Sequence, residues 1–295
     1  MEIKMKSKRN ENLEQFAQKT TDKIIKILEG IDAGKWSKGW FPCTGAYNVV
    51  SKRQYTGMNQ FNLSMLDYEI PMYSTFKGWQ SIQCNVKKGE KGHQIQVYSI
   101  NKKLDKETGK EKTVFYSNVA YVFNVAQVEG ELPKYENSKN PESTNDEIEK
   151  FISNCNIETI HKFSNKAFYL PITDQVNMPK FEQFKGSIEY YSTLFHEYAH
   201  ATGNKNRLNR DLSGAFGSSK YAFEELVAEL SSVFTMQHLG YYDTEIREDH
   251  LQYLKSWLQA LKDDNKFILK ASSKAIKASE YLINKQMKKE NQKIA

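Results

Sequence analysis

Apolar side chains change their spacing along this chain from helical to strand-like and back to helical. In residues 12–29 they recur every three or four positions and Gly30 follows, which predicts an amphipathic helix. The basic residues 1–10 before it are expected to form a flexible arm. Residues 34–48 are rich in glycine and tryptophan and predict a loop, and helical spacing returns at 59–68.

The strand-like part lies between residues 79 and 128. Its segments 94–100, 113–119 and 120–125 are rich in β-branched and aromatic residues, which favour strands. The charged segment 103–112 separates the first two and is expected to be a hairpin tip. This part of the chain therefore predicts an antiparallel sheet.

A polar segment with two prolines, at residues 133–147, is predicted to link an N-terminal domain, 1–132, to a C-terminal domain, 148–295. We expect an α+β fold in which a small mixed domain with an antiparallel sheet precedes a mostly helical domain. In the second domain the pattern predicts a short helix at 148–155, one or two strands at 167–179, and helices at roughly 186–202, 219–239, 246–263 and 272–290.

Composition narrows the class of protein. No run of about 18 apolar residues is present, so no membrane helix is expected, and the N-terminus lacks the apolar segment of a secretory signal. The three cysteines, Cys43, Cys84 and Cys155, are odd in number and widely spaced, which favours neither a disulfide framework nor a cysteine-based zinc site. We therefore expect a cytoplasmic protein with no membrane partner.

The positive charge is concentrated in the first half. Residues 1–133 contain 20 Lys and Arg against 14 Asp and Glu, whereas residues 134–295 contain 22 of each. One interpretation is a solvated face that aids solubility. The other is a surface that binds a polyanion such as nucleic acid.

The strongest chemical signal is the segment YSTLFHEYAHATG at 191–203. His196 and His200 are four positions apart, so on a helix they share one face, one turn apart, and can bind one ion. Glu197 lies beside the first imidazole, where it can take a proton from a water on that ion. This is the H-E-x-x-H pattern of zincin metallopeptidases, with Glu197 as the candidate catalytic base.

Tight zinc binding needs a third ligand, and FEELVAELSSVF at 223–234 supplies carboxylates on a second helix. Glu225 and Glu229 are four positions apart among apolar neighbours, where a carboxylate needs a metal or an imidazole as its partner. We assign Glu225 as the third metal ligand and Glu229 as the residue that orients an imidazole. Glu224 is the alternative ligand. The competing interpretation places Glu224 and Glu225 in solvent near a helix N-terminus.

These residues predict a zinc-dependent metallopeptidase that binds one Zn²⁺, or another divalent metal in its place. The ion would polarise a carbonyl, and Glu197 would move a proton from water to the leaving amine. An iron site uses the same ligand types, but Glu197 has no role in oxygen chemistry. A degenerate site kept only for folding is the other alternative. Candidate oxyanion stabilisers are Tyr190, Tyr191, Arg207 and Arg210, each with a structural interpretation as well.

Aromatic residues are interleaved with basic and amide residues in the first half, which is the combination that single-stranded nucleic acid requires. The competing interpretation is that these aromatic residues form the core and that the basic loop near residue 90 is a plain turn. The candidate DNA-binding residues are Trp36, Lys38, Trp40, Asn48, Arg53, Tyr55, Asn59, Trp79, Lys87, Lys88 and Lys91.

The order of several segments resembles that of the ArdC-like antirestriction proteins of mobile elements, over about residues 12 to 283. In the first half the matching segments are WSKGW at 36–40, YN at 47–48, YTGMN at 55–59, Trp79, KGEKG at 88–92 and YVFNVAQ at 121–127. In the second half they are DQVNMP at 174–179, the histidine segment at 191–203, RLNR at 207–210, FGSSKYAFEELVAE at 216–229 and WLQALKD at 257–263.

The resemblance implies a single-stranded-DNA-binding domain followed by a zincin-like metallopeptidase domain. It implies metal binding by His196, His200 and a glutamate, and protection of mobile-element DNA against host restriction. The peptidase substrate does not follow from it. Ala199 and Ala201 stand where the family often has Gly and Trp, which puts substrate contacts in question more than metal binding. The rival hypotheses are a DNA-binding protein with a structural metal site, and a general peptidase whose basic half docks to acidic partners.

Overall fold

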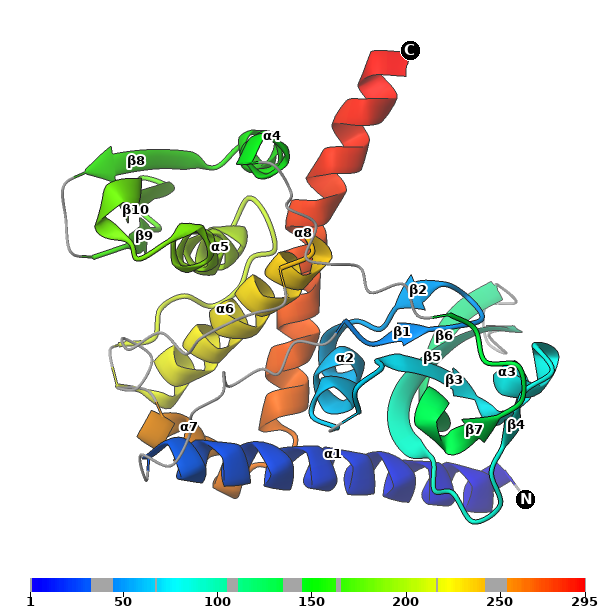
Figure 1. The fold of residues 1–295 in the computed structure, drawn as a ribbon. Helices are drawn as coiled ribbons and strands as arrows, with labels where there is room; N and C mark the ends of the chain where they lie inside the picture. Colours follow the sequence, from blue (N-terminus) through cyan, green and yellow to red (C-terminus); the bar gives the residue numbers. More distant parts are fainter. Residues whose placement is uncertain are drawn as a thin grey trace. The chain divides into compact units, whose positions relative to one another are not determined.

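The chain divides into two units of internal contact (Figure 1). The computed structural model describes residues 2–32, 45–66, 68–104, 111–134, 145–162, 166–215, 217–241 and 254–294. Unit 1 comprises Met1–Lys23 and Ala46–Tyr135, and unit 2 comprises Ile24–Gly45 and Glu136–Ala295. Most of the expected loop at 34–48, the centre of the expected hairpin tip and most of the expected linker lie outside the described residues.

Helix α1 extends over Glu2–Asp32, so the expected flexible arm at 1–10 is helical from Glu2 onward. The reason is local, because these residues include neither Gly nor Pro and are mostly good helix formers. Phe16 and Ala17 of this helix are buried in unit 1. Ile24 and Leu28 are buried further along, in the part of the helix that belongs to unit 2.

Unit 1 is built on a five-stranded sheet in the order β2-β1-β3-β6-β5. All its neighbours are antiparallel except β1 and β3, which are parallel. The two segments expected at 113–119 and 120–125 form one continuous strand, β6. The strands are β1 Tyr47–Asn48, β2 Arg53–Gln54, β3 Met72–Thr75, β5 His93–Leu104 and β6 Glu111–Asn124.

The two faces of this sheet are covered differently. Helix α2 (Gly57–Ser64) covers one face, where Leu63 packs with Ile95 and Val122. On the other face, α3 (Phe76–Ser81), β4 (Asn85–Val86), the short 3-10 turn Val125–Gln127 and β7 (Val128–Glu129) form a second cluster around Trp79 and Val128.

Unit 2 is mostly helical, with one small sheet ordered β8-β10-β9. Strands β8 and β10 are parallel, and β9 is antiparallel to β10. Strand β8 was not expected from the sequence, because three of its five residues are exposed and its apolar content is low. The elements are α4 Asn145–Cys155, β8 Glu158–Lys162, β9 Phe168–Leu170, β10 Gln175–Pro179, a 3-10 turn Phe181–Gln183, α5 Ser187–Thr202, α6 Ser219–His238, α7 Leu254–Asp263 and α8 Phe267–Ile294.

Helix α6 packs against both α5 and α8, so it lies at the centre of unit 2 (Figure 1). The indole of Trp257 in α7 is buried and donates to the carbonyl of Ala222 at 2.8 Å, which fixes α7 to the start of α6. Two cysteines among the described residues are buried, Cys84 in unit 1 and Cys155 in unit 2, both at most 1% exposed.

The predicted α+β class is confirmed, with a sheet-based first unit and a mostly helical second unit. Among the described residues no helix combines the length and the hydropathy needed to cross a membrane. The arrangement of α5 and α6 in unit 2 matters most for function, because it brings side chains from two distant parts of the sequence to one point.

Candidate metal centre and nucleic-acid interface

Helix α5 places His196 and His200 one turn apart on the face that meets α6. The helix is fixed at its start, where the carboxylate of Glu189 accepts from the backbone N–H of Lys185 at 2.6 Å. The two imidazole rings lie edge to face with centroids 4.9 Å apart, and their Nε2 atoms are 3.2 Å apart. Both rings therefore present the same kind of nitrogen to one point.

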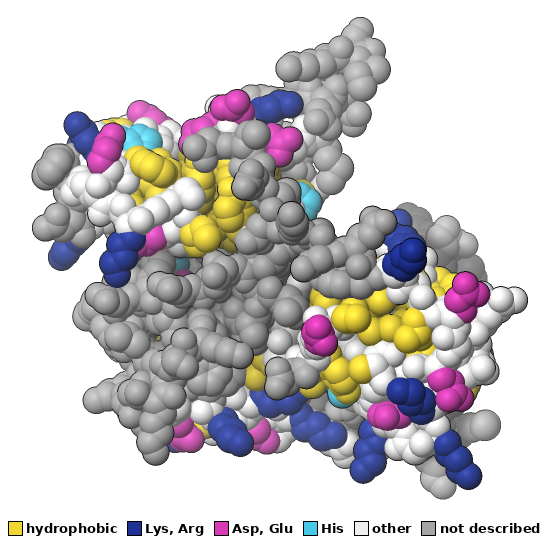
Figure 2. Space-filling model, viewed as in Figure 1, with side chains coloured by type: hydrophobic (Ala, Val, Ile, Leu, Met, Phe, Trp, Pro, Cys, Tyr) yellow, Lys and Arg dark blue, Asp and Glu magenta, His cyan; other side chains and the backbone are white. Residues whose placement is uncertain are grey.

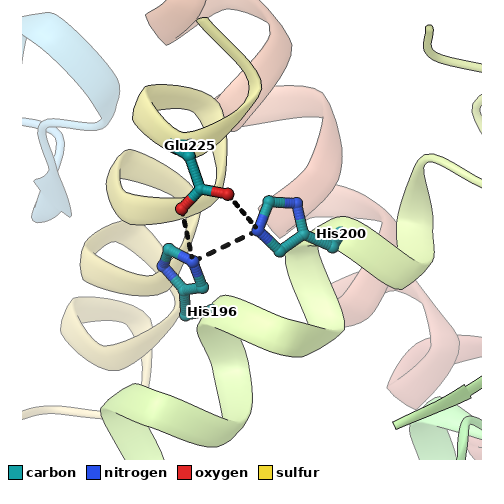
Figure 3. A group of neighbouring side chains, drawn as sticks. All are labelled: His196, His200 and Glu225. Carbon is teal, nitrogen blue, oxygen red and sulfur yellow. Dashed lines mark hydrogen bonds and ion pairs between the residues drawn. The ribbon is translucent and has the colours of Figure 1, made fainter. Parts of the chain in front are cut away.

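Glu225 of α6 meets that point from the opposite side (Figure 3). One carboxylate oxygen lies 3.5 Å from Nε2 of His196, and the other lies 3.5 Å from Nε2 of His200. The three ligand atoms, two nitrogens and one oxygen, all lie within 4.8 Å of one another. Two imidazoles and one carboxylate that converge in this way match a donor set that catalytic zinc sites use.

Two further glutamates of α6 contact the far sides of the imidazoles. Nδ1 of His196 is 3.4 Å from the carboxylate of Glu229, and Nδ1 of His200 is 3.4 Å from that of Glu224. A carboxylate at Nδ1 favours the tautomer that keeps its proton there and leaves Nε2 as a metal donor. Glu224, the alternative ligand from the sequence, thus lies behind His200 rather than beside Nε2.

Arg210 supports Glu224 from the loop between α5 and α6. Its guanidinium donates to both oxygens of Glu224, at 2.6 Å from Nη2 and 3.1 Å from Nε. The same side chain donates to the hydroxyl of Thr202 at 2.8 Å and to the carbonyl of Ala199 at 2.7 Å, at the end of α5. Gly203 leaves room for this contact, since a Cβ there would lie 3.1 Å from Nη2 of Arg210.

The electrostatics of this cluster favour a bound cation. Burial disfavours the charged imidazolium of His200, but hydrogen bonds to Glu224 and Glu225 outweigh burial and raise its pKa to about 10. Burial alone would raise the pKa of Glu225, yet the imidazoles of His196 and His200 hold it well below its usual range. Glu197, Glu224, Glu225 and Glu229 are buried in this cluster with the two histidines, and the guanidinium of Arg210 pairs with Glu224. The donor set and its charge fit a divalent metal.

Glu197 is buried on the same helix, with 6% of its surface exposed. Its negative charge contributes to the raised pKa of His200, so it lies within electrostatic range of that imidazole. The four candidate oxyanion stabilisers are all engaged with other side chains. They pair as Tyr190 with His161, Tyr191 with Glu149, Arg207 with Asp174 and Arg210 with Glu224.

The candidate DNA-binding residues occupy different environments. Trp36, Lys38 and Trp40 lie outside the described residues. The prediction that Trp79 binds DNA is wrong. It is fully buried, and its indole donates to the carbonyl of Phe123 at 3.0 Å, so its rings have no accessible face for a base. Trp79 is a core residue.

Three of the predicted polar residues stabilise the fold of unit 1. Asn48 accepts from the backbone N–H groups of residues 50–51 and donates to the hydroxyl of Tyr55 at 3.2 Å. Burial raises the pKa of Tyr55 to about 12. Asn59 exchanges two hydrogen bonds with the backbone of Gln96, at 2.6 and 2.7 Å. These contacts tie loops and helix α2 to the sheet.

The predicted cations remain on the surface. Arg53, Lys87, Lys88 and Lys91 are exposed. The ammonium of Lys87 donates to the carbonyl of Ala126 at 2.9 Å, which holds the basic loop against the turn after β6. Sequence reasoning missed the support that Arg210 gives to Glu224. The segment RLNR at 207–210 drew attention, but no pattern indicates which carboxylate its arginines reach.

Two protein families match the sequence. The N-terminal domain of anti-restriction factor ArdC matches residues 14–128, and a zincin-like metallopeptidase family matches residues 146–274. Uncharacterized protein y4eC of Sinorhizobium fredii is 35% identical over 274 residues, which cover 87% of this chain and 88% of that protein. DNA primase TraC of Escherichia coli is 31% identical over 91% of this chain, and the match spans 27% of the primase.

Solved structures show the same relationship. The metal-free crystal structure of antirestriction protein ArdC from plasmid R388 has a TM-score of 0.71 and 30% identity, covering 91% of this chain and 97% of that one. The Mn(II)-bound structure of the same protein also has a TM-score of 0.71, with 29% identity and the same coverage.

Proposed function

This chain belongs to the ArdC-like family of antirestriction proteins, and from that premise we propose that it binds single-stranded DNA and has a zinc metallopeptidase site. Residues 1–132 bind the DNA, residues 148–295 hold the metal, and residues 133–147 join them. The protein protects mobile-element DNA as it enters the cytoplasm of a new host. The observation that supports the enzymatic part is the convergence of His196, His200 and Glu225.

In this proposal His196, His200 and Glu225 hold the ion, and Glu229 and Glu224 orient the two imidazoles. Zinc supplies Lewis acidity towards a carbonyl oxygen and lowers the pKa of water. The carboxylate of Glu197 accepts a proton from the attacking water and returns it to the leaving nitrogen of a peptide substrate. Burial of these groups keeps bulk water away and strengthens their interactions with the developing charges.

The nature of the metal is tested by elemental analysis of the purified protein. We propose one zinc ion per chain, although the related R388 protein has a Mn(II)-bound structure. His196→Ala removes one ligand and should abolish stoichiometric metal. A protein that purifies with manganese and rejects zinc in competition would overturn the zinc assignment but keep the site.

The peptidase is tested with Glu197→Gln, which keeps the shape of the side chain and removes the base. It should bind metal like the parent protein and lose both hydrolysis of labelled casein and protection of DNA in transfer assays into a restricting host. Glu182→Gln, an exposed glutamate outside the site, is the matched control. Full protection by the Glu197 variant would favour the second candidate, a DNA-binding protein whose metal site is structural.

DNA binding is tested by fluorescence anisotropy with labelled single- and double-stranded oligonucleotides at several salt concentrations. The exposed cations of unit 1 predict binding that weakens with salt. A preference for the single strand supports the proposal. Equal affinity for both forms, or no binding at low salt, would instead favour a general peptidase that docks to acidic partners through its basic half.

A further inference from the structure

Helix α3 covers only part of one face of the sheet in unit 1. The other half of that face is open to solvent. Side chains of directly paired residues on adjacent strands lie on the same face. Gln94 of β5 pairs with Tyr121 of β6, and Phe123 of β6 pairs with Ser74 of β3. Phe123 lies at the edge of the cluster around Trp79, and Tyr121 lies beyond that cluster. The part of the face that includes Tyr121 is therefore accessible.

Two large aromatic side chains are exposed there. Tyr121 is 51% exposed and Phe76, at the start of α3, is 48% exposed. Phe76 lies edge to face with Phe123, with ring centroids 6.4 Å apart. Exposure of this much aromatic surface costs free energy in water unless a ligand covers it. We call Phe76, Tyr121 and Phe123 the aromatic ledge.

The ledge is held in place by its neighbours. The amide of Gln94 donates to the hydroxyl of Tyr121 at 3.1 Å. Gly92 lies against the ledge, because a Cβ at this position would be 3.0 Å from both the Cβ of Tyr121 and the ring of Phe123. An aromatic ring that is already fixed loses little conformational freedom when a planar ligand stacks on it.

Cations border the ledge. Lys77 follows Phe76 directly, Lys91 precedes Gly92, and both are exposed. Lys88 is exposed in the same loop, and the ammonium of Lys19 lies 3.5 Å from the side-chain oxygen of Gln94. Figure 2 shows hydrophobic patches on the surface of unit 1 with Lys and Arg side chains, and also Asp and Glu side chains, around them. Exposed aromatic rings bordered by lysines suit unpaired bases joined by phosphates.

We infer that the aromatic ledge is the base-stacking surface for single-stranded DNA, with Lys77, Lys88 and Lys91 along the path of the phosphates. This inference rests on the proposed DNA-binding function and names the residues that perform it. It replaces the buried Trp79 with exposed rings that sequence reasoning did not select. A duplex cannot use the ledge, because its bases are already stacked on one another.

The test measures anisotropy of a labelled oligothymidine with the full-length protein. Tyr121→Ala and Phe76→Ala should each weaken single-strand binding roughly 5- to 150-fold, the range expected for the loss of one stacked base. Tyr121→Phe keeps the ring and loses only the hydrogen bond from Gln94, so it should bind much more tightly than Tyr121→Ala. Phe168→Ala, at an aromatic in unit 2 that is 41% exposed, is the control and should change nothing. Thermal melts establish that each variant is folded.

The salt dependence separates stacking from charge. Tyr121→Ala should lower affinity without changing the slope of log K against log salt, whereas Lys88→Gln with Lys91→Gln should reduce that slope by about 1.4. Crosslinking with 5-iodouracil should label Tyr121, Phe76 or Phe123. If the parent protein binds no single strand, the proposed function fails. If it binds and the ring variants bind equally well without crosslinks at these residues, only the ledge is overturned.

Discussion

Arg210 donates to both carboxylate oxygens of Glu224, and this pairing extends the candidate metal site one layer beyond its imidazoles. Glu224 contacts Nδ1 of His200, so the order of contacts runs from arginine to carboxylate to an imidazole that is a proposed metal ligand. The arginine side chain is 5% exposed, and among the described residues Glu224 is the carboxylate with which it pairs. The orientation of one ligand therefore depends on a residue in a loop.

Replacing Arg210 with glutamine should weaken metal binding. The change leaves Glu224 buried without its counter-charge, and loss of such support behind a ligand typically costs 10- to 100-fold in metal affinity. Competition titration with a zinc indicator measures the effect. Arg207→Gln removes an arginine from the same loop that pairs with Asp174 instead, and it should leave the affinity nearly unchanged. Equal losses in both variants would indicate a general effect on the loop.

Glu229→Gln tests the other imidazole. The amide can no longer accept strongly from Nδ1–H of His196, so we expect a loss of metal affinity of roughly 10-fold or more with the fold retained. Glu280→Gln, an exposed glutamate of α8, is the control. Unchanged affinity in Glu229→Gln would show that the imidazole is oriented by packing alone.

Metal removal should destabilise the protein. Buried carboxylates repel one another without a cation, and binding to the folded state stabilises it by about 4 kcal/mol when free zinc exceeds its Kd about 1,000-fold. Melting temperature with zinc should therefore exceed that with EDTA in the parent protein. In Glu225→Gln the two melting temperatures should nearly coincide. A chelator effect of equal size in that variant would place the responsible ion elsewhere.

The ion pair of Asp174 with Arg207 predicts a dependence of stability on pH. Burial acts against ionisation, but the hydrogen bond from Arg207 outweighs it and lowers the pKa of Asp174. A lowered folded-state pKa stabilises the fold above the unfolded pKa of about 4, and this contribution disappears as pH falls through the folded value. Asp174→Asn should therefore melt roughly a few degrees below the parent protein at pH 7, with a smaller gap at pH 3.

The control for that experiment is Asp263→Asn, at an exposed site on α7. Its melting temperature should follow that of the parent protein at both pH values. A gap between Asp174→Asn and the parent protein that is the same at pH 3 and pH 7 would show that the carboxylate contributes through shape rather than charge.

Trp79→Ala should lower the stability of unit 1 without removing a direct contact to DNA. Truncation of a fully buried indole typically costs about 3–5 kcal/mol, and here it also removes the hydrogen bond to Phe123. Chemical denaturation measures the loss, and anisotropy at a temperature where the variant is folded measures DNA affinity. A stable variant with weakened DNA binding would restore Trp79 as a base-stacking residue.

Local signals in the sequence predicted most of the helices. The spacing of apolar residues located α5 and α6 to within about two residues, because amphipathic periodicity reflects burial along one helix. The same periodicity placed His196 and His200 on one face of α5, and it placed Glu225 and Glu229 on one face of α6. Relations within one helix depend only on spacing, and so they can be derived without knowledge of the tertiary fold.

Relations between elements were harder to predict. Arg210 and Glu224 are separated by a loop and by fourteen positions, and no periodic pattern connects them. Trp79 and Tyr121 illustrate the same difficulty in unit 1. Both are aromatic residues in strand-rich sequence, yet one is fully buried and the other is half-exposed. Trp79 belongs to α3 and is packed against the sheet, whereas Tyr121 lies on a part of β6 that α3 leaves uncovered. This difference in burial follows from the tertiary fold.

The reactivity of the two buried cysteines reports local unfolding in each unit. The thiol of Cys84 contacts the carbonyl of Glu131 at 3.4 Å, and that of Cys155 contacts the carbonyl of Phe151 at 3.3 Å. An alkylating reagent can reach either sulfur only when the surrounding structure unfolds locally. In a Cys43→Ser background, mass spectrometry of the two labelled peptides would measure the alkylation rate of each thiol separately. A slower rate with DNA or zinc would show that the ligand suppresses local opening of that unit.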